Sequence, residues 1–372
     1  MKKVVIKKED LIYNIEKIKE HAERKGKDDN GNYTKIIAVV KGNGYGLDIV
    51  SYTKFLIDQG INFFAVATVE EALKIRQAGI NENLLMLSST CIKEDIELLI
   101  KNHVILTVGS EEAVKCVNEI AQKLGKKVRV HLKIDTGFGR YGFIYSERDK
   151  MIEALKSAEN LKIEGTYTHF SNSYYDDQYT QTQFKRFIDC IEVLKMNEIE
   201  TGILHVCNSS AFIKFPSMHL NAVRIGSAFL GRLSIPNKLG LKKIGYLESE
   251  VAEIKELPKN FNIGYSNTYK TKKKTDIAII PCGYMDGINM QTGRDTFRGI
   301  DKLRYIVRDI KDAMKKQALY VNIGGQECKI LGRVGTYHIC ADITGKNIKI
   351  GDEAIFNIYP GYVDSSIRRE YK

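Results

Sequence analysis

The sequence has no uninterrupted apolar run that approaches the ~18 residues of a membrane-spanning helix. Its N-terminus, MKKVVIKKEDL, has lysines but lacks the apolar segment of a secretory signal peptide. Internal repeats and low-complexity tracts are also absent. With 43% hydrophobic and 28% charged residues, the 372-residue chain has the composition of a soluble globular protein with no membrane partner.

Paired cysteines are missing as well. The seven cysteines are scattered along the chain, and none forms a CxxC pair or a cluster with histidine. The sequence therefore predicts neither a disulfide framework nor a zinc site. We expect no bound metal and a cytoplasmic location, where thiols stay reduced.

The chain contains fewer acidic than basic residues, and its formal net charge is +11. Lysine and arginine gather at 270–274, KTKKK, and along 301–317. Such patches attract nucleic acid or anionic lipid in some proteins. No nucleic-acid-binding motif accompanies them, so we interpret them as solvated surface and expect no nucleic-acid partner.

Apolar runs alternate with amphipathic stretches over the first 226 residues. The runs end near Lys41, Val69, Thr90, Gly109, Asp135, Phe170, Ser209 and Gly226. Eight strands separated by helical patterns predict an α/β fold with a (β/α)8 TIM barrel. The uneven spacing leaves a doubly wound sheet open as an alternative.

The pattern changes after about residue 235, where short β-like runs separated by turn residues replace the helical stretches. We predict a C-terminal all-β domain over 236–372 and assign 11–235 to the barrel. Residues 1–10 contain a short strand that we expect to join the β domain. The basic segment 301–317 is predicted to be a helical insertion.

Lys41 ends the first apolar run of the predicted barrel, and GNGYG follows it at 42–46. These loop residues tolerate positive φ, and the C-terminal end of an early strand is where barrel enzymes place their chemistry. An amine among apolar neighbours has a lowered pKa, and its neutral form can make a Schiff base or take a proton. On these residues alone, a surface lysine is the simpler interpretation.

Six motifs occur in order along the chain: AVVKGNGYG, KIDTGFGRYG, GTYTHF, HVCNSS, AVRIGSAFLG and PCGYMDG. Together they resemble the alanine racemase family of fold-type III pyridoxal phosphate (PLP) enzymes, and the likeness extends over nearly the whole chain. It implies an isomerase that uses PLP to interconvert L- and D-alanine and supplies D-amino acid for peptidoglycan. It also implies a homodimer with shared active sites.

The resemblance places the two proton-transferring groups at Lys41 and Tyr265. Lys41 matches the lysine that binds PLP, and Tyr265, in NIGYSNTY, matches a tyrosine that the partner subunit contributes. Racemisation removes the α-proton from one face of the substrate and returns a proton to the other, which requires two such groups. Without the resemblance, nothing distinguishes Tyr265 from the other tyrosines among the 20 in the chain.

The other cofactor contacts follow from the same resemblance. Arg224 matches the arginine that donates to the pyridine nitrogen, and a guanidinium gives up no proton, so that nitrogen stays unprotonated. The ring is then a poorer electron sink, which limits transamination. The remaining expected contacts are Tyr45, Ser209 and the N–H groups of Gly226 and Ser227 at the phosphate, and His169 against the ring.

The resemblance also implies five substrate contacts. Arg140 matches the arginine that binds the substrate carboxylate. Lys133 matches a lysine that is carbamylated in many members and orients that arginine, and Asn208 matches a residue near the same network. Tyr284 matches a tyrosine at the substrate entrance, and Thr336 lies in a segment whose backbone holds the carboxylate.

Several segments depart from the family pattern. YGLD replaces the usual YGHG, and GTYH at 335–338 replaces CMDQ. The tail DSSIRREY places Ser365 or Ser366 where a tyrosine often contacts the phosphate. This tail and the insertion at 301–317 are similar to those of the VanT-type serine/alanine racemases of vancomycin resistance, so a serine racemase is an alternative.

The sequence is also compatible with other functions. One is a racemase for a larger amino acid such as ornithine or lysine. A PLP-dependent decarboxylase shares the two-domain plan, but Cys282 lies in the racemase pattern PCGYMDG. A non-catalytic PLP-binding protein would consist of the barrel alone. We expect activity on alanine, measurable activity on serine, and little on lysine or ornithine.

Overall fold

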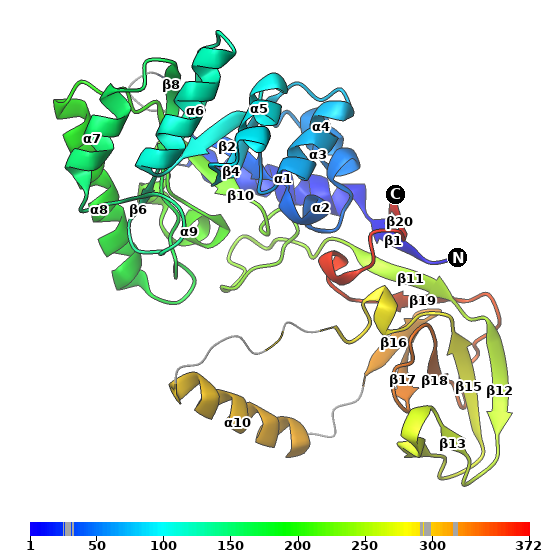
Figure 1. Ribbon diagram of the computed structural model, residues 1–372. Coiled ribbons are helices and arrows are strands. Elements are labelled where there is room, and N and C mark those ends of the chain that lie inside the picture. Colours follow the sequence, from blue (N-terminus) through cyan, green and yellow to red (C-terminus); the bar gives the residue numbers. More distant parts are fainter. Residues whose placement is uncertain (25, 27–30, 32, 291–292, 294–298, 315–318) are drawn as a thin grey trace. The chain divides into compact units, whose positions relative to one another are not determined.

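The computed structural model describes residues 1–24, 26, 31, 33–290, 293, 299–314 and 319–372. These residues form two compact units, one of residues 7–244 and one of residues 1–6 with 245–372 (Figure 1). No helix in the described ranges has the length and hydropathy of a membrane span. The same ranges contain no group of three or more His, Cys, Asp or Glu side chains placed to hold a metal ion.

The larger unit contains a closed barrel of parallel strands in the order β5-β4-β3-β2-β10-β9-β8-β6, and β5 pairs with β6 to complete the ring. The strands are β2 (Lys35–Val39), β3 (Phe63–Val66), β4 (Asn83–Ser89), β5 (Ile105–Val108), β6 (Val128–Asp135), β8 (Leu161–Tyr167), β9 (Ile203–His205) and β10 (Ala222–Ile225), with the short β7 (Phe143–Ile144) added beside β6. Closure confirms the predicted TIM barrel and excludes the doubly wound sheet, which has open edges.

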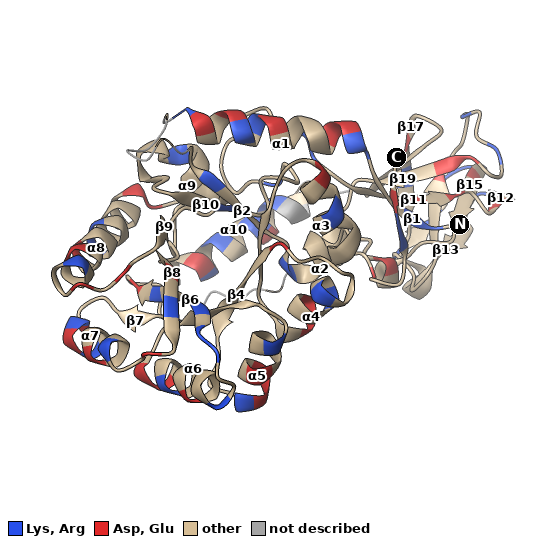
Figure 2. Cartoon of the chain, turned by 90° about the horizontal axis from the view of Figure 1, so that it is seen from above, with Lys and Arg blue, Asp and Glu red and all other residues tan. Residues whose placement is uncertain are grey.

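Helices surround the barrel on its outside (Figure 1). They are α1 (Lys8–Glu23), α3 (Ile49–Asp58), α4 (Val69–Gln77), α5 (Lys93–Lys101), α6 (Glu111–Lys123), α7 (Arg148–Lys156), α8 (Asp177–Met196) and α9 (Ser209–Lys214). Side chains cap several of them: Thr68 accepts from the N–H of Glu71, and Ser110 accepts from that of Ala113. Acidic and basic segments alternate along α1, as expected for a solvated helix face (Figure 2).

The smaller unit is a nine-stranded sheet in the order β12-β15-β18-β17-β16-β19-β11-β1-β20. Its strands are β1 (Lys3–Ile6), β11 (Tyr246–Glu250), β12 (Glu253–Leu257), β15 (Thr275–Ile280), β16 (Tyr320–Ile323), β17 (Gln326–Leu331), β18 (Ile339–Asp342), β19 (Glu353–Phe356) and β20 (Arg368–Tyr371), and a separate hairpin joins β13 (Asn262–Ile263) to β14 (Tyr269–Lys270). This arrangement confirms the predicted all-β sheet domain.

The two ends of the chain meet in this sheet. Strand β1 pairs antiparallel with β11 and parallel with β20. The expected basic insertion forms α10 (Gly299–Met314), and the last part of the prediction, 315–317, lies outside the described residues.

Candidate active site

The turn after β2 holds Lys41 at the C-terminal mouth of the barrel. This turn, α2 (Lys41–Tyr45), is left-handed, because Gly42, Asn43 and Gly44 have φ values of 66°, 52° and 66°. Glu71 of α4 fixes it: one carboxylate oxygen accepts from the N–H of Gly42 at 2.5 Å and from that of Asn43 at 3.3 Å. The glycines of the GNGYG sequence predict this backbone, because glycine has no Cβ and adopts the left-handed conformation without a steric penalty.

Lys41 is an exposed residue, yet the pKa of its amine is lowered. Partial removal of water by the surrounding protein is the main cause, and the positive charge of Arg140 adds to it. A lowered pKa increases the fraction of neutral amine near pH 7. The lysine is therefore suited to attack a carbonyl carbon and to accept a proton.

Arg224 of β10 lies next to β2, and only 3% of it is exposed. One terminal nitrogen donates to the Nδ1 atom and carbonyl of His205 at 2.9 and 2.8 Å. The other contacts the carbonyl oxygens of Thr168 and Val206 at 2.7 and 3.2 Å and Nδ1 of His169 at 3.3 Å. These contacts use the terminal N–H groups, and no hydrogen bond within the described chain uses Nε–H.

Burial lowers the pKa of Arg224 to about 10, so the guanidinium keeps its charge at neutral pH. Burial and the charge of Arg224 also hold the pKa of His169 well below its usual value. Because Arg224 can only donate to Nδ1 of His169, that neutral ring carries its proton on Nε2. His169 also meets the ring of Phe138 edge-on, with centroids 5.4 Å apart.

Ser209 and Gly226 form a small polar cradle beside Tyr45. The hydroxyl of Ser209, at the start of α9, accepts from the N–H groups of Gly226 and Ala228 at 3.2 and 3.3 Å. A Cβ at Gly226 would overlap the hydroxyl of Tyr45, so only glycine lets the phenol approach this turn. Hydroxyl and backbone N–H donors in one concave turn are suited to a phosphate.

Two further predicted residues lie beside this cradle. Asn208 caps α9 through its side-chain oxygen, which accepts from the N–H of Ala211 at 3.0 Å and from the hydroxyl of Ser173 at 2.9 Å. Ser227 directly follows Gly226, and its carbonyl accepts from the N–H of Leu230 at 3.1 Å. Asn208 thus shapes the turn that presents Ser209.

Lys133 and Arg140 bring more positive charge to the same mouth. Lys133, at 5% exposure, has its amine 5.3 Å from the ring centres of Tyr141 and Tyr167. Burial, reinforced by Arg224 and Arg140, lowers the pKa of Lys133 to about 7. The guanidinium of Arg140 lies 4.4 Å from the ring centre of Phe138.

The loop that carries Arg140 is shaped by Asp135. One carboxylate oxygen accepts from the N–H groups of Gly137 and Phe138 at 2.8 and 2.7 Å. The other accepts from those of Gly139 and Arg140 at 2.8 and 3.1 Å. Four hydrogen bonds to one side chain fix the turn and so limit the positions from which Arg140 can reach a ligand.

The β unit carries the other three predicted residues. Tyr265 begins the 3-10 turn η2 (Tyr265–Asn267), and 68% of it is exposed. Tyr284 begins η3 (Tyr284–Asp286), and the hydroxyl of Thr336 donates to its phenolic oxygen at 3.1 Å. Tyr284 and Thr336 therefore lie together in this unit.

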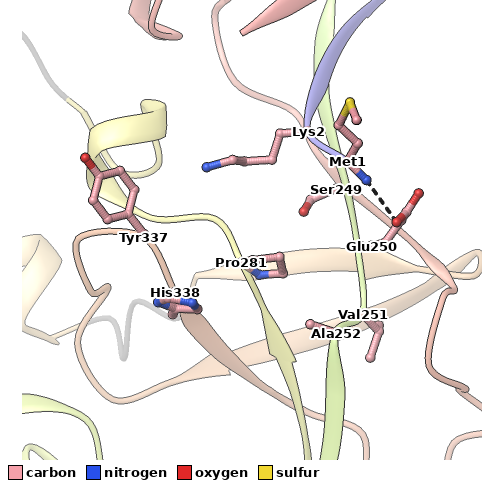
Figure 3. A pocket seen from close by; sticks show the side chains of 9 residues that line it. All are labelled: Met1, Lys2, Ser249, Glu250, Val251, Ala252, Pro281, Tyr337 and His338. Atoms are coloured by element: carbon pink, nitrogen blue, oxygen red, sulfur yellow. Dashed lines mark hydrogen bonds and ion pairs between the residues drawn. The ribbon is translucent and has the colours of Figure 1, made fainter.

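A hollow of about 370 Å³ opens beside Tyr337 and His338 in this unit (Figure 3). Tyr337 and His338 form one side, and the ion pair between the Met1 amine and Glu250, 2.9 Å long, forms another. The segment that departs from CMDQ is therefore open to solvent in this chain.

The site residues predicted from the sequence do not include the side chains that fix the geometry of the site. Glu71 and Asp135 bind backbone N–H groups, and His205 holds Arg224. The sequence carried a signal for Asp135 alone, because an aspartate followed by glycines at the second and fourth positions is typical of a turn capped by its own side chain.

The assembled groups fit PLP in kind. The amine of Lys41, with its lowered pKa, suits the aldehyde of PLP. The Ser209–Gly226 cradle suits the phosphate, and the Nε–H of buried Arg224 suits an unprotonated ring nitrogen. All three come from the ends or turns of neighbouring strands β2, β9 and β10.

Comparison with known proteins matches both units to the family that the sequence motifs resemble. The description "Alanine racemase, N-terminal domain" matches residues 6–233, and "Alanine racemase, C-terminal domain" matches residues 244–363. The chain is similar to the alanine racemase of Methanococcus maripaludis, with 36% identity over 68% of this chain and 69% of that protein. It is also similar to alanine racemase 1 of Oceanobacillus iheyensis, with 28% identity over 97% and 90%. A solved structure of alanine racemase from Clostridium difficile 630 superposes with a TM-score of 0.82 and 29% identity, over 99% of this chain and 88% of that one.

Proposed function

Because the chain belongs to the alanine racemase family, we propose that it interconverts L- and D-alanine with PLP bound at the barrel mouth. The convergence of Lys41, the Ser209–Gly226 cradle and buried Arg224 supports this proposal most directly. Bound there, PLP would stabilise the negative charge that the departing α-proton leaves on the substrate. Serine, ornithine and lysine racemisation are the alternatives to compare.

A racemisation assay on a panel of L-amino acids tests this function. We expect PLP-dependent formation of D-alanine, slower formation of D-serine and little reaction with ornithine or lysine. Alanine and serine differ by one hydroxyl, which a pocket discriminates by roughly 1–3 kcal/mol. A preference for ornithine or lysine would contradict the proposed substrate.

Lys41 and Tyr265 are proposed as the two proton-transferring groups, one for each face of the substrate. Lys41 holds or accepts a proton at Nζ, and its lowered pKa supports that role. Tyr265 would act at its phenolic oxygen from the second subunit of a homodimer. Its 68% exposure within one chain is consistent with a role in a partner's site.

The remaining residues are proposed to bind and orient. Arg140 and the segment that contains Thr336 would hold the substrate carboxylate, and Tyr284 would lie at the substrate entrance. The phosphate would be held by Tyr45, Ser209, Gly226 and Ser227. His169 would pack against the ring, and Asn208 would shape the cradle. We further propose a cytoplasmic enzyme whose D-alanine enters peptidoglycan, tested by the D-alanine requirement of cells that lack it.

Arg224→Glu is expected to lower kcat/KM for racemisation roughly 100-fold, equivalent to about 2.7 kcal/mol. A carboxylate facing the ring nitrogen favours its protonated form, which strengthens the electron sink and raises the share of transamination. Pyruvate formed per racemisation event measures this partition. Arg308→Glu on exposed α10 is the matched control, and an unchanged partition in Arg224→Glu would show that Arg224 does not face the ring.

Lys133 is proposed to be carbamylated, because only a neutral amine adds to carbon dioxide and its pKa is lowered to about 7. At fixed dissolved carbon dioxide, the carbamate should increase as pH rises from about 6 to about 8, since the neutral fraction grows over that range. Carbon-13 NMR with labelled carbon dioxide measures it. The signal should vanish in Lys133→Ala, and its absence from the unsubstituted protein at both pH values would contradict the proposal.

A further inference from the structure

The turn that begins at Tyr284 is joined by its backbone to the segment that contains Thr336. The N–H groups of Tyr284 and Met285 donate to the carbonyl oxygens of Gly335 and Thr336 at 3.0 and 3.2 Å. Gly283 permits this close approach, because a Cβ there would lie 2.3 Å from each of these two oxygens. The hydroxyl of Thr336 also donates to that of Tyr284 at 3.1 Å. A shift of the turn therefore moves both of these predicted substrate contacts together.

Asp286 fixes the shape of this turn from within the β unit. Only 3% of the residue is exposed. One carboxylate oxygen accepts from the N–H of Gly283 at 2.8 Å, and the other accepts from the amine of Lys2 at 2.7 Å. Among the described residues, Lys2 is the one ion-pair partner of this carboxylate. Because a buried carboxylate without a cation is strongly destabilising, the position of the turn depends on Lys2.

Lys2 is itself held in place at the start of the sheet. The next residue, Lys3, begins the pairing of β1 with both β11 and β20. The side chain of Lys2 extends toward Tyr337 (Figure 3), and its amine lies 5.4 Å from the centre of that ring. Tyr337 directly follows Thr336 in the chain. The same ammonium group therefore lies against the Asp286 turn and against the Thr336 segment.

We propose that Lys2 is a positioning residue for the reaction: its ion pair with Asp286 sets the positions of Tyr284 and of the segment that contains Thr336. This inference rests on the proposed function, in which that segment holds the substrate carboxylate and Tyr284 lies at the substrate entrance. Lys2 acts through the turn rather than by contact with the substrate. Since both affected contacts bind the substrate before the proton moves, they contribute to KM rather than to kcat.

Lys2→Met is expected to raise KM for L-alanine about tenfold and to keep kcat within about twofold of normal, because the turn loses the cation that holds it. Lys2→Arg restores a cation and should return KM to within about twofold of normal. Lys3→Met is the matched control, because the amine of Lys3 pairs with Glu248 and Glu370 instead. Its KM should stay unchanged. Equal KM values in Lys2→Met and Lys3→Met would overturn the proposal.

Fluorine-19 NMR of protein labelled with 3-fluorotyrosine tests the position of Tyr284 independently of activity. The spectrum of Tyr284→Phe identifies the Tyr284 signal. We expect Lys2→Met to shift this signal, and Lys2→Arg and Lys3→Met to leave it close to its position in the unsubstituted protein. A Tyr284 signal that stays in place in Lys2→Met would show that the ion pair does not fix the turn.

A double-mutant cycle tests whether Lys2 acts through Asp286. Asp286→Asn keeps an acceptor for the N–H of Gly283 and removes the buried charge, so Lys2→Met should raise KM much less in that background. An equal increase in both backgrounds would overturn the proposed coupling. If the unsubstituted protein does not racemise alanine, the proposed function fails, and the fluorine signal of Tyr284 then decides whether Lys2 positions the turn.

Discussion

Lys41→Ala is expected to lower kcat for L-alanine racemisation by about 10³-fold or more, because it removes both the proposed PLP-binding group and one of the two proposed proton-transferring groups. A single lost acid–base group accounts for roughly 10²–10⁴ of that factor. Loss of bound PLP would add to it, since the remaining groups of the proposed site, the cradle and Arg224, would contact the cofactor only noncovalently. The fold should survive, because the side chain is exposed.

The measurement combines chiral chromatography of alanine with an absorbance spectrum of the protein after PLP loading. Lys54→Ala, an exposed lysine on α3, is the matched control and should retain full activity and full PLP content. Circular dichroism confirms that each variant is folded. A Lys41→Ala protein with more than about one tenth of normal activity would assign the covalent link and the proton transfer to another residue.

Tyr265→Phe is expected to lower kcat by roughly 10²–10⁴-fold while PLP stays bound, because only the phenolic hydroxyl is removed. Tyr269→Phe, a half-buried tyrosine of the neighbouring strand β14, is the control and should remain active. The contrast with Lys41→Ala is diagnostic: one variant loses the cofactor link, and the other keeps it. Equal activity of the two tyrosine variants would remove Tyr265 from the mechanism.

Shared sites predict that the two inactive variants rescue each other. After equimolar mixing and subunit exchange, half of the dimers are hybrids with one intact site, so about a quarter of normal activity should return. The exchange itself is verified by mass spectrometry of the intact dimers. No recovery despite exchange would place both groups in one subunit, and activity that does not fall on dilution through the dimer constant would point the same way.

Much of the barrel could be predicted from the sequence. Each of the eight apolar runs became a barrel strand, and the strand before Lys41 ends at Val39. The alternation of helix and strand patterns is compatible with few parallel-sheet topologies. The pairing of β5 with β6 is what closes the sheet into a barrel. The left-handed turn at Gly42–Gly44 was equally predictable, because local chemistry decides it.

Features that depend on distant parts of the chain could not be predicted in this way. The run SEVAEIKEL reads as one strand, yet it is divided between β11 and β12, which pair with different neighbours. Strand β1 pairs with β20, from the other end of the chain, and periodicity does not specify a partner.

The site shows the same limit. His131 and His205 are 74 positions apart, and their hydrogen bond follows from barrel geometry rather than from a local pattern. Glu71 likewise reaches the Lys41 turn from α4, which lies beyond α3 and β3 in the chain. Motifs identified the side chains that are proposed to bind the ligands, whereas the residues that fix their positions could be identified only from the fold.

Exchange of the alanine α-proton in deuterium oxide tests the central claim most directly. L-Alanine is incubated with PLP-loaded protein, and proton NMR and chiral chromatography follow the same sample. We predict that the α-proton signal disappears while the mixture approaches equal amounts of L- and D-alanine, because a proton from solvent is returned to either face. Exchange with retention of the L-configuration, or release of pyruvate without D-alanine, would contradict racemisation by two groups on opposite faces.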